Sequence, residues 1–278
     1  MSGSTLANFA AKVGGLFQFN RDFLFITLDS LRFDSAADSL AAGATPTFKR
    51  LIGQWQRRQT SATYTLPAHV AMFSGSMPRP PRGDDRTVDT EPRMFALSTS
   101  WNRYRGRNIR YCFDDAENVP KGFESKGYRT IGVGGVGWFS NEVKSSSFWQ
   151  GRYFQHFLYK PSYGEENPRA FEEQIDDLTR VMRQPARGRN FVFLNVSSTH
   201  RPYSNGDGTL SVKAQRMCLE YVDRQLPKLL GLFPRGAVGV VCGDHGDCMG
   251  EDGLWGHNVV HEQVMTVPYA EFEFKGAN

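Results

Sequence analysis

The sequence lacks the features of membrane, secreted or disulfide-rich proteins. No uninterrupted apolar stretch reaches about 18 residues, and the N-terminus has no basic region followed by a long apolar run. The 4 cysteines stand at irregular spacing without a CxxC, which argues against a disulfide framework or a zinc-thiolate site. We therefore expect a cytoplasmic protein that has no membrane span and whose thiols are free.

The chain also has little net charge. Its 33 Lys and Arg stand against 29 Asp and Glu, a formal charge of +4, so the balance suits an anionic substrate and requires no nucleic acid. One stretch, WNRYRGRNIRYC (101–112), interleaves arginine with aromatic residues and could hold phosphates and stacked bases. It is a single stretch, so selection of an anionic substrate at the rim of a site is favoured over nucleic-acid binding.

Four short apolar runs, rich in β-branched and aromatic residues, predict buried strands. They are FLFITL (23–28), YRTIGVGG (128–135), FVFLNV (191–196) and AVGVVC (237–242). Helical patterns lie at 46–56, 168–184 and about 211–226, and Pro227 is expected to interrupt the last. This alternation predicts one α/β domain over residues 1–278, a doubly wound, mostly parallel sheet with helices on both faces. Residues 76–118 are expected to form an irregular surface excursion.

Ionisable residues follow three of the four predicted strands. Asp29 comes directly after the first, His200 four residues after the third, and the pair Asp244 and His245 just after the fourth. Ligands of open α/β sheets bind beyond the carboxyl ends of the strands, so these side chains should converge. Each has a plainer interpretation when taken alone, since Asp29 could cap a helix and His200 could be a solvated loop residue. Carboxylate and imidazole together suit a divalent cation.

The segment TYTLPAH (63–69) predicts the start of a helix. Pro67 suits the first turn and Thr65 the position just before it. The Thr65 hydroxyl would then lie beside free backbone N–H groups and the positive end of the helix, where a transferring phosphate can be held. The alternative is an ordinary turn into a helix. Further along, His257 and His261 are four residues apart and would share one face if that segment were helical.

Several of these segments together resemble the sulfatase-like members of the alkaline phosphatase superfamily. The matching segments are ITLDSLRFD (26–34), TPTFKRL through to FSG (45–75), KGYRTIGVGG (126–135), FVFLNVSSTHRPYS (191–204) and GDHGDCMGEDGLWGH through to VPY (243–269). They occur in the order found in that family. The resemblance implies an alkaline phosphatase-like fold for the whole chain.

The resemblance also implies roles for individual residues. Asp29, Asp244 and His245 correspond to metal ligands, and Thr65 to the nucleophile and a further ligand. His200 and His257 would contact the substrate anion or act as the general acid, and His69 would support the nucleophile or contact the anion. These roles imply one divalent ion, Mn²⁺, Zn²⁺, Mg²⁺ or Ca²⁺, and leave a second ion at His200 and His257 open.

Departures from the family narrow the implied activity. Threonine replaces the cysteine that sulfatases modify, which implies a phosphodiesterase or phosphotransferase acting on a small anionic phosphate ester, such as a phosphodiester, phosphomonoester or phosphonate ester. Little sequence follows the VPYAEFEF segment, so most of the usual C-terminal subdomain is expected to be missing, and an oligomer or partner chain could cover that side. A catalytically inactive scaffold is the remaining alternative.

Overall fold

The computed structural model describes residues 21–77, 79, 94–96, 110–112, 118–142, 149–185 and 188–276. The strands are β1 (Asp22–Leu28), β2 (Gln56–Gln59), β3 (Met94–Ala96), β4 (Arg110–Cys112), β5 (Arg129–Val133), β6 (His156–Leu158), β7 (Asn190–Val196), β8 (Ala237–Gly243), β9 (Cys248–Met249), β10 (Trp255–Gly256) and β11 (Thr266–Phe274). The helices are α2 (Phe33–Ala41), α3 (Pro46–Ile52), α4 (Thr65–Ser74), α5 (Val119–Ser125), α6 (Ala170–Met182), α7 (Val212–Leu230) and α8 (Glu262–Met265).

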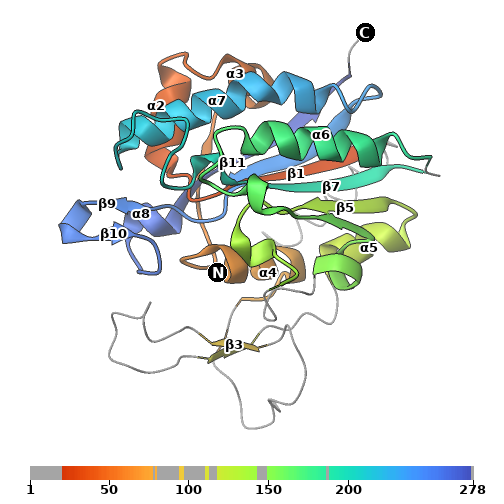
Figure 1. Ribbon diagram of the computed structural model, residues 1–278, viewed down its shortest axis with the longest axis horizontal. Coiled ribbons are helices and arrows are strands. Elements are labelled where there is room, and N and C mark those ends of the chain that lie inside the picture. The colour runs from red at the N-terminus through yellow and green to blue at the C-terminus, as the bar shows by residue number, and fades with distance from the viewer. Residues whose placement is uncertain are drawn as a thin grey trace.

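A 7-stranded sheet in the order β2-β11-β8-β1-β7-β5-β6 forms the centre of the molecule. Strands β8, β1, β7, β5 and β6 run parallel, and β11 and β2 add an antiparallel edge. Helices α2, α3, α6 and α7 cover one face, while α4 and α5 lie on the other (Figure 1). The predicted doubly wound, mostly parallel α/β fold is therefore confirmed.

Alternation along the central strands divides the core between the two faces of the sheet. Leu24 and Ile26 of β1 pack on the side of α6 and α7, whereas Phe25 packs on the side of α4. Strand β7 repeats the pattern, with Leu194 on the first side and Phe193 on the second. Because both faces are covered, the strands read as continuous apolar runs in the sequence.

Two predicted helix boundaries are wrong. Helix α3 ends at Ile52 because Gly53 adopts φ +72°, and the chain then enters β2 instead of continuing to residue 56. Helix α7 continues through Pro227 to Leu230, although a proline inside a helix costs about 3 kcal/mol. Leu226, Leu229 and Leu230 are buried around it, and their packing outweighs that cost.

Most of the predicted excursion at 76–118 lies outside the described residues. Within it, the structure describes the antiparallel pair β3 and β4, the latter being the last part of the arginine-rich stretch. Among the described helices, none combines the length and the apolar character that crossing a membrane requires.

Candidate active site

The ionisable residues predicted at the strand ends meet at the carboxyl edge of the sheet. Asp29 follows β1, Asp244 and His245 follow β8, and one ligand atom from each lies within 4.8 Å of the other two. All three side chains are fully buried. Adjacent parallel strands deliver them to one place, because β1 and β8 pair directly along their whole length.

Neighbouring polar groups fix the Asp29 carboxylate. Its Oδ2 accepts a hydrogen bond from Asn195 Nδ2 at 3.1 Å, and its Oδ1 accepts one from Ser30 Oγ at 3.2 Å. The Thr199 hydroxyl donates to the Asp29 backbone carbonyl at 2.8 Å. Burial raises the pKa of Asp29, and the nearby Asp244 carboxylate raises it further.

Asp244 has one satisfied oxygen and one unsatisfied oxygen. Its Oδ1 accepts from the backbone N–H groups of Ser30 at 3.0 Å and His245 at 2.9 Å. Its Oδ2 is buried and has no hydrogen-bond partner among the residues that the structure describes. Burial raises the pKa of Asp244 to about 7. A buried carboxylate oxygen without a donor is costly, and a cation is one group that would satisfy it.

The imidazole of His245 turns its unprotonated nitrogen toward the two carboxylates. Nδ1 lies 2.9 Å from the Gly246 carbonyl oxygen, which can only accept, so Nδ1 carries the proton. Nε2 then has a lone pair and lies 3.8 Å from Asp29 Oδ1 and 3.6 Å from Asp244 Oδ2. Burial and the nearby His257 lower the pKa of His245 to about 3, so the ring is neutral. Three lone-pair donors around one point fit a divalent cation.

Thr65 brings its hydroxyl to the same point. It is the first residue of α4, preceded by the extended Tyr64, so it stands one position further into the helix than predicted. Its Oγ1 is 3.4 Å from Asp29 Oδ2 and 3.4 Å from His245 Nε2. Both contacts are long for hydrogen bonds. The hydroxyl thus lies at the cluster without being tightly held by it.

His69 supports the start of α4 from below. Its Nδ1 donates to the Thr65 carbonyl at 2.8 Å, and its Nε2 accepts from the Thr27 hydroxyl at 2.8 Å. The ring is fully buried, and burial lowers its pKa to about 3. Both nitrogens are therefore occupied by protein groups. This placement favours support of Thr65 over contact with a substrate.

The two remaining predicted histidines lie together beside the cluster. The ring centroids of His257 and His245 are 4.5 Å apart, and those of His257 and His200 are 5.4 Å apart. His257 Nδ1 donates to Asp247 Oδ1 at 2.8 Å, and His200 Nδ1 donates to the Arg201 carbonyl at 2.6 Å. Each ring keeps Nε2 as its second nitrogen for proton transfer or anion contact.

His261 does not share a helix face with His257. Residues 257–260 are not helical, and His261 precedes α8, where its Nδ1 accepts from the Gln263 backbone N–H at 3.1 Å. Its Nε2 lies 3.3 Å from Asp252 Oδ2. His261 therefore has a capping role in the structure.

Sequence reasoning missed three residues that hold the site together. Asn195 orients Asp29, Asp247 orients His257, and Gln215 of α7 donates to the carbonyls of Ser30 at 2.8 Å and Thr199 at 3.2 Å. Asn195 had a signal, since it is the one polar residue in FVFLNV. Gln215 had none, because its partners are distant in sequence.

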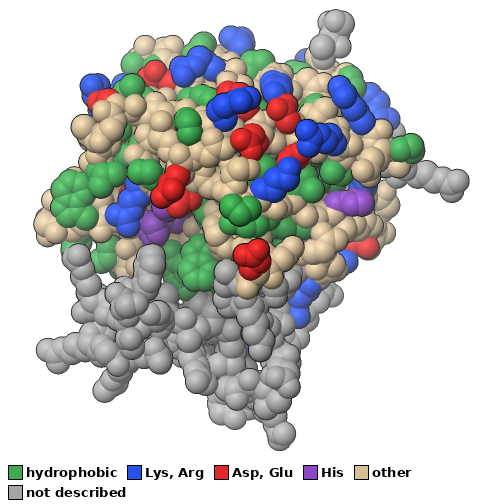
Figure 2. Space-filling model, viewed as in Figure 1, with side chains coloured by type: hydrophobic (Ala, Val, Ile, Leu, Met, Phe, Trp, Pro, Cys, Tyr) green, Lys and Arg blue, Asp and Glu red, His purple; other side chains and the backbone are tan. Residues whose placement is uncertain are grey.

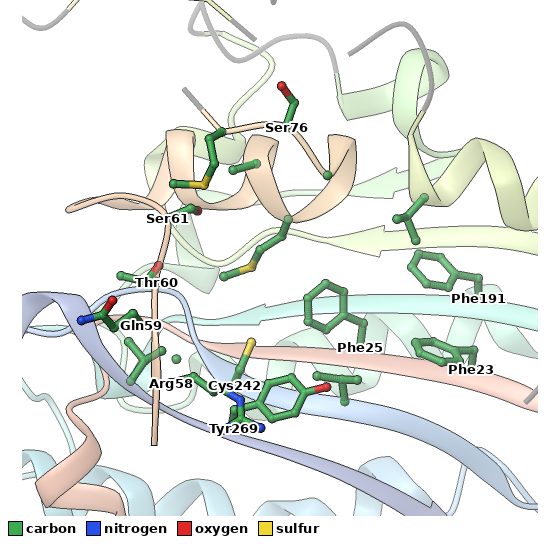
Figure 3. Close-up of a pocket in the computed structure, with 18 residues that line it drawn as sticks. Phe23, Phe25, Arg58, Gln59, Thr60, Ser61, Ser76, Phe191, Cys242 and Tyr269 are labelled. Carbon is green, nitrogen blue, oxygen red and sulfur yellow. The ribbon is translucent and has the colours of Figure 1, made fainter. Parts of the chain in front are cut away.

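A separate apolar cavity of about 350 Å³ lies between α4 and the sheet. Figure 3 shows Phe23, Phe25 and Phe191 standing on the sheet beside it. Apolar side chains dominate its wall, and Asp29, Asp244 and Thr65 are not among its lining residues. The polar cluster is therefore distinct from the cavity, although Gly243, which lines the cavity, directly precedes Asp244.

Comparison with known proteins identifies the fold. No family model matches the sequence, and no curated protein matches it. Solved structures do match, among them an alkaline phosphatase superfamily protein from Vibrio parahaemolyticus, with a TM-score of 0.55 and 16% identity over 91% of this chain and 60% of that one. The C-terminal periplasmic domain of Escherichia coli EptC, in complex with Zn, has a TM-score of 0.58 and 12% identity over 92% of this chain and 73% of that one. The corresponding domain of the Campylobacter jejuni phosphoethanolamine transferase EptC has a TM-score of 0.55 and 15% identity over 91% of this chain and 79% of that one.

These similarities show that the chain has the fold of alkaline phosphatase superfamily structures. This chain spans 60% of the length of the Vibrio parahaemolyticus protein. At these identities the comparison concerns the fold, so activity and substrate depend on the geometry of the site.

Proposed function

We propose that this chain is a metal-dependent enzyme that transfers a phosphoryl-type group from a small phosphate ester through a covalent Thr65 intermediate. One observation carries the proposal: the Thr65 hydroxyl lies 3.4 Å from both Asp29 Oδ2 and His245 Nε2, in a buried cluster where an Asp244 oxygen has no partner. The fold shared with phosphoethanolamine transferases supports the same class of reaction.

The residues present fit a divalent cation. Asp29, Asp244, His245 and Thr65 would supply three oxygens and one nitrogen, a mixed set that suits Zn²⁺ or Mn²⁺ and also allows Mg²⁺ or Ca²⁺. When bound, such a cation supplies positive charge that lowers the pKa of the threonine hydroxyl and offsets charge on the phosphoryl oxygens. The EptC structure in complex with Zn makes zinc the first metal to test.

In the first half of the reaction, Thr65 and the histidines have separate roles. Thr65 Oγ1 first gives its proton to solvent water and then attacks phosphorus, and the bond from phosphorus to the alcohol oxygen breaks as the new bond forms. The departing oxygen takes a proton from His257 or His200, which lie beside the cluster. His69 holds the first turn of α4, and the positive end of that helix favours the anion.

The second half of the reaction frees the threonine. Water or an acceptor alcohol attacks the phosphothreonine, gives its proton to a histidine, and releases Thr65 Oγ1. Water would make the enzyme a hydrolase, and an alcohol would make it a transferase. The transferases among the similar structures favour the alcohol.

The alternatives are less well supported. A catalytically inactive scaffold has no need of four competent side chains around an unpaired buried carboxylate oxygen. Nucleic-acid binding would favour a continuous basic surface. On the visible face in Figure 2, basic and acidic side chains are interspersed over the helices.

The test compares the wild type with Thr65→Ala and Thr65→Ser after metal loading. Turnover of 4-nitrophenyl phosphate, bis(4-nitrophenyl) phosphate and a 4-nitrophenyl phosphonate is measured, and the modified residue is located by mass spectrometry of acid-quenched protein. We expect Thr65→Ala to lose at least about a thousandfold in kcat and Thr65→Ser to keep part of it. Thr63→Ala, two residues away, is the matched control and should retain full activity.

A phosphorylated Thr65 peptide in the wild type alone would establish the covalent step. Equal turnover by wild type and Thr65→Ala would show that another group attacks phosphorus. Complete inactivity of the wild type with every metal and ester would favour the scaffold alternative.

A further inference from the structure

Arg201 has a guanidinium that the described part of the protein leaves largely unused. Among the described residues its ionic contact is with Asp247 Oδ2, which lies 4.0 Å from Nε, too far for a hydrogen bond. The side chain is 36% exposed. Asp247 does not depend on Arg201 for a partner, because it already accepts from His257 at 2.8 Å and lies 3.4 Å from the Tyr203 hydroxyl.

One side of this guanidinium is closely packed. It lies against the backbone of Gly256 in β10, where a Cβ atom would come within 2.6 Å of one terminal nitrogen and 2.9 Å of the other. Gly256 has φ +84°, a backbone conformation that residues with a side chain rarely adopt. A bare backbone therefore provides the seat, and any larger residue at 256 would displace the guanidinium.

Arg32, which is buried, provides a comparison with a structural role. Arg32 is 2% exposed and donates to Asp34 through two nitrogens, at 2.9 and 2.6 Å, and to Glu251 at 2.6 Å. All of its charge is used inside the protein. Arg201 differs, since its guanidinium lies against the Gly256 backbone and its ionic contact within the described part of the chain is a long one, at 4.0 Å.

The direction of the contacts places Arg201 on the outer side of the site. A series of contacts connects the proposed metal-binding cluster with Arg201. The ring of His257 lies 4.5 Å from that of His245 between centroids, His257 donates to Asp247, and Asp247 is the ionic partner of Arg201. The cluster residues Asp29, Asp244 and His245 are fully buried whereas Arg201 is 36% exposed, so a group bound by Arg201 would lie nearer the surface than the cluster. The guanidinium fork fits the paired oxygens of a carboxylate or phosphate.

We propose that Arg201 is a specificity-determining residue that binds a second oxyanion group on the alcohol portion of the phosphate ester. This rests on the proposed function, in that the first phosphate is taken to occupy the cluster at Thr65. The preferred substrate is then a phosphate ester whose alcohol carries a further negative charge.

Calorimetric titration of the full chain in the Thr65→Ala background, with zinc present, tests this without turnover. Three matched ligands are used: glycerol 1-phosphate, 3-phosphoglycerate, in which a carboxylate replaces the hydroxymethyl group, and glycerol 1,3-bisphosphate. We expect the two doubly anionic ligands to bind about tenfold tighter than glycerol 1-phosphate, the size of one good charge-assisted hydrogen bond. The stronger of the two identifies the oxyanion as carboxylate or phosphate.

Arg201→Met should remove this preference and change glycerol 1-phosphate binding less than twofold, while Arg201→Lys restores part of the preference. Arg183→Met, an exposed arginine after α6, is the control and should keep it. No preference in the parent, or an equal loss for all three ligands in Arg201→Met, would overturn the proposal and leave Arg201 with a structural role. Because the readout is binding, failure of the Thr65 chemistry would be seen separately, in the turnover assay.

Discussion

Replacing Asp244 with asparagine should make the metal-free protein more stable at neutral pH while weakening its response to metal. The Oδ2 atom of Asp244 has no hydrogen-bond partner and lies 3.6 Å from the unprotonated Nε2 of His245. An asparagine amide at this position can donate to that nitrogen. Oδ1 would still accept from the backbone N–H groups of Ser30 and His245, so the fold of the loop should be retained.

The size of the effect follows from the pKa of Asp244. Burial raises it from 3.8 to about 7, a difference of about 3 pH units at about 1.36 kcal/mol each, or up to about 4 kcal/mol. For an acid whose pKa is higher in the folded state, the stability is fully present below pH about 4 and is lost as the pH rises to about 7. The variant lacks this titration, so its advantage should be near zero at pH 4 and greatest at pH 8.

The assay is urea denaturation of both proteins at pH 4, 6 and 8, first with a chelator and then with zinc. A cation present at a free concentration of 100 times its Kd would stabilise the wild type by about 2.7 kcal/mol, and Asp244→Asn should gain much less stability from it. A variant less stable than the wild type at pH 8 without metal would refute the idea of an uncompensated carboxylate. Equal stabilisation of both by zinc would place the cation elsewhere.

Two further variants examine residues that position others. Asp247→Asn should lower the kcat of phosphate-ester turnover about 10- to 100-fold with little change in KM, because His257 loses the carboxylate that fixes its tautomer. Steady-state kinetics measure both constants, and an unchanged kcat would contradict this prediction. Gln215→Leu leaves the buried carbonyls of Ser30 and Thr199 without their donor, so it should lower the free energy of unfolding by about 2–4 kcal/mol. Urea denaturation measures this, and a loss below about 0.5 kcal/mol would show that the carbonyls find other partners.

The fold was largely predictable because its central strands are buried on both faces. Each predicted strand appears within a residue or two, from β1 at Asp22–Leu28 to β8 at Ala237–Gly243. The convergence of Asp29, Asp244 and His245 followed from one rule, that parallel strands end at the same edge. The continuation of α7 through Pro227 was not predictable, since it depends on leucines packing against other helices.

The details of the site were less accessible from the sequence. The contact of His69 with the Thr65 carbonyl is local to α4, but its contact with Thr27, 42 residues earlier, depends on how α4 packs on β1. The link from Gln215 to Ser30 spans 185 residues and leaves no local pattern. Such contacts become visible only when the strands are already in register.

The antiparallel direction of β11 affects how this protein can change over evolutionary time. Strand β8 runs toward the site and β11 runs away from it, with Cys242 paired to Tyr269, so residues 244–265 leave and rejoin the sheet at the same edge. That segment contains the proposed metal ligand His245, the histidine His257 and Gly256, against which Arg201 packs. Insertions, deletions and substitutions within it can therefore accumulate without shifting the register of the sheet. The part of this segment beyond His245 could thus acquire new substrate contacts while β1 and β8, which deliver Asp29 and Asp244 to the site, stay unchanged.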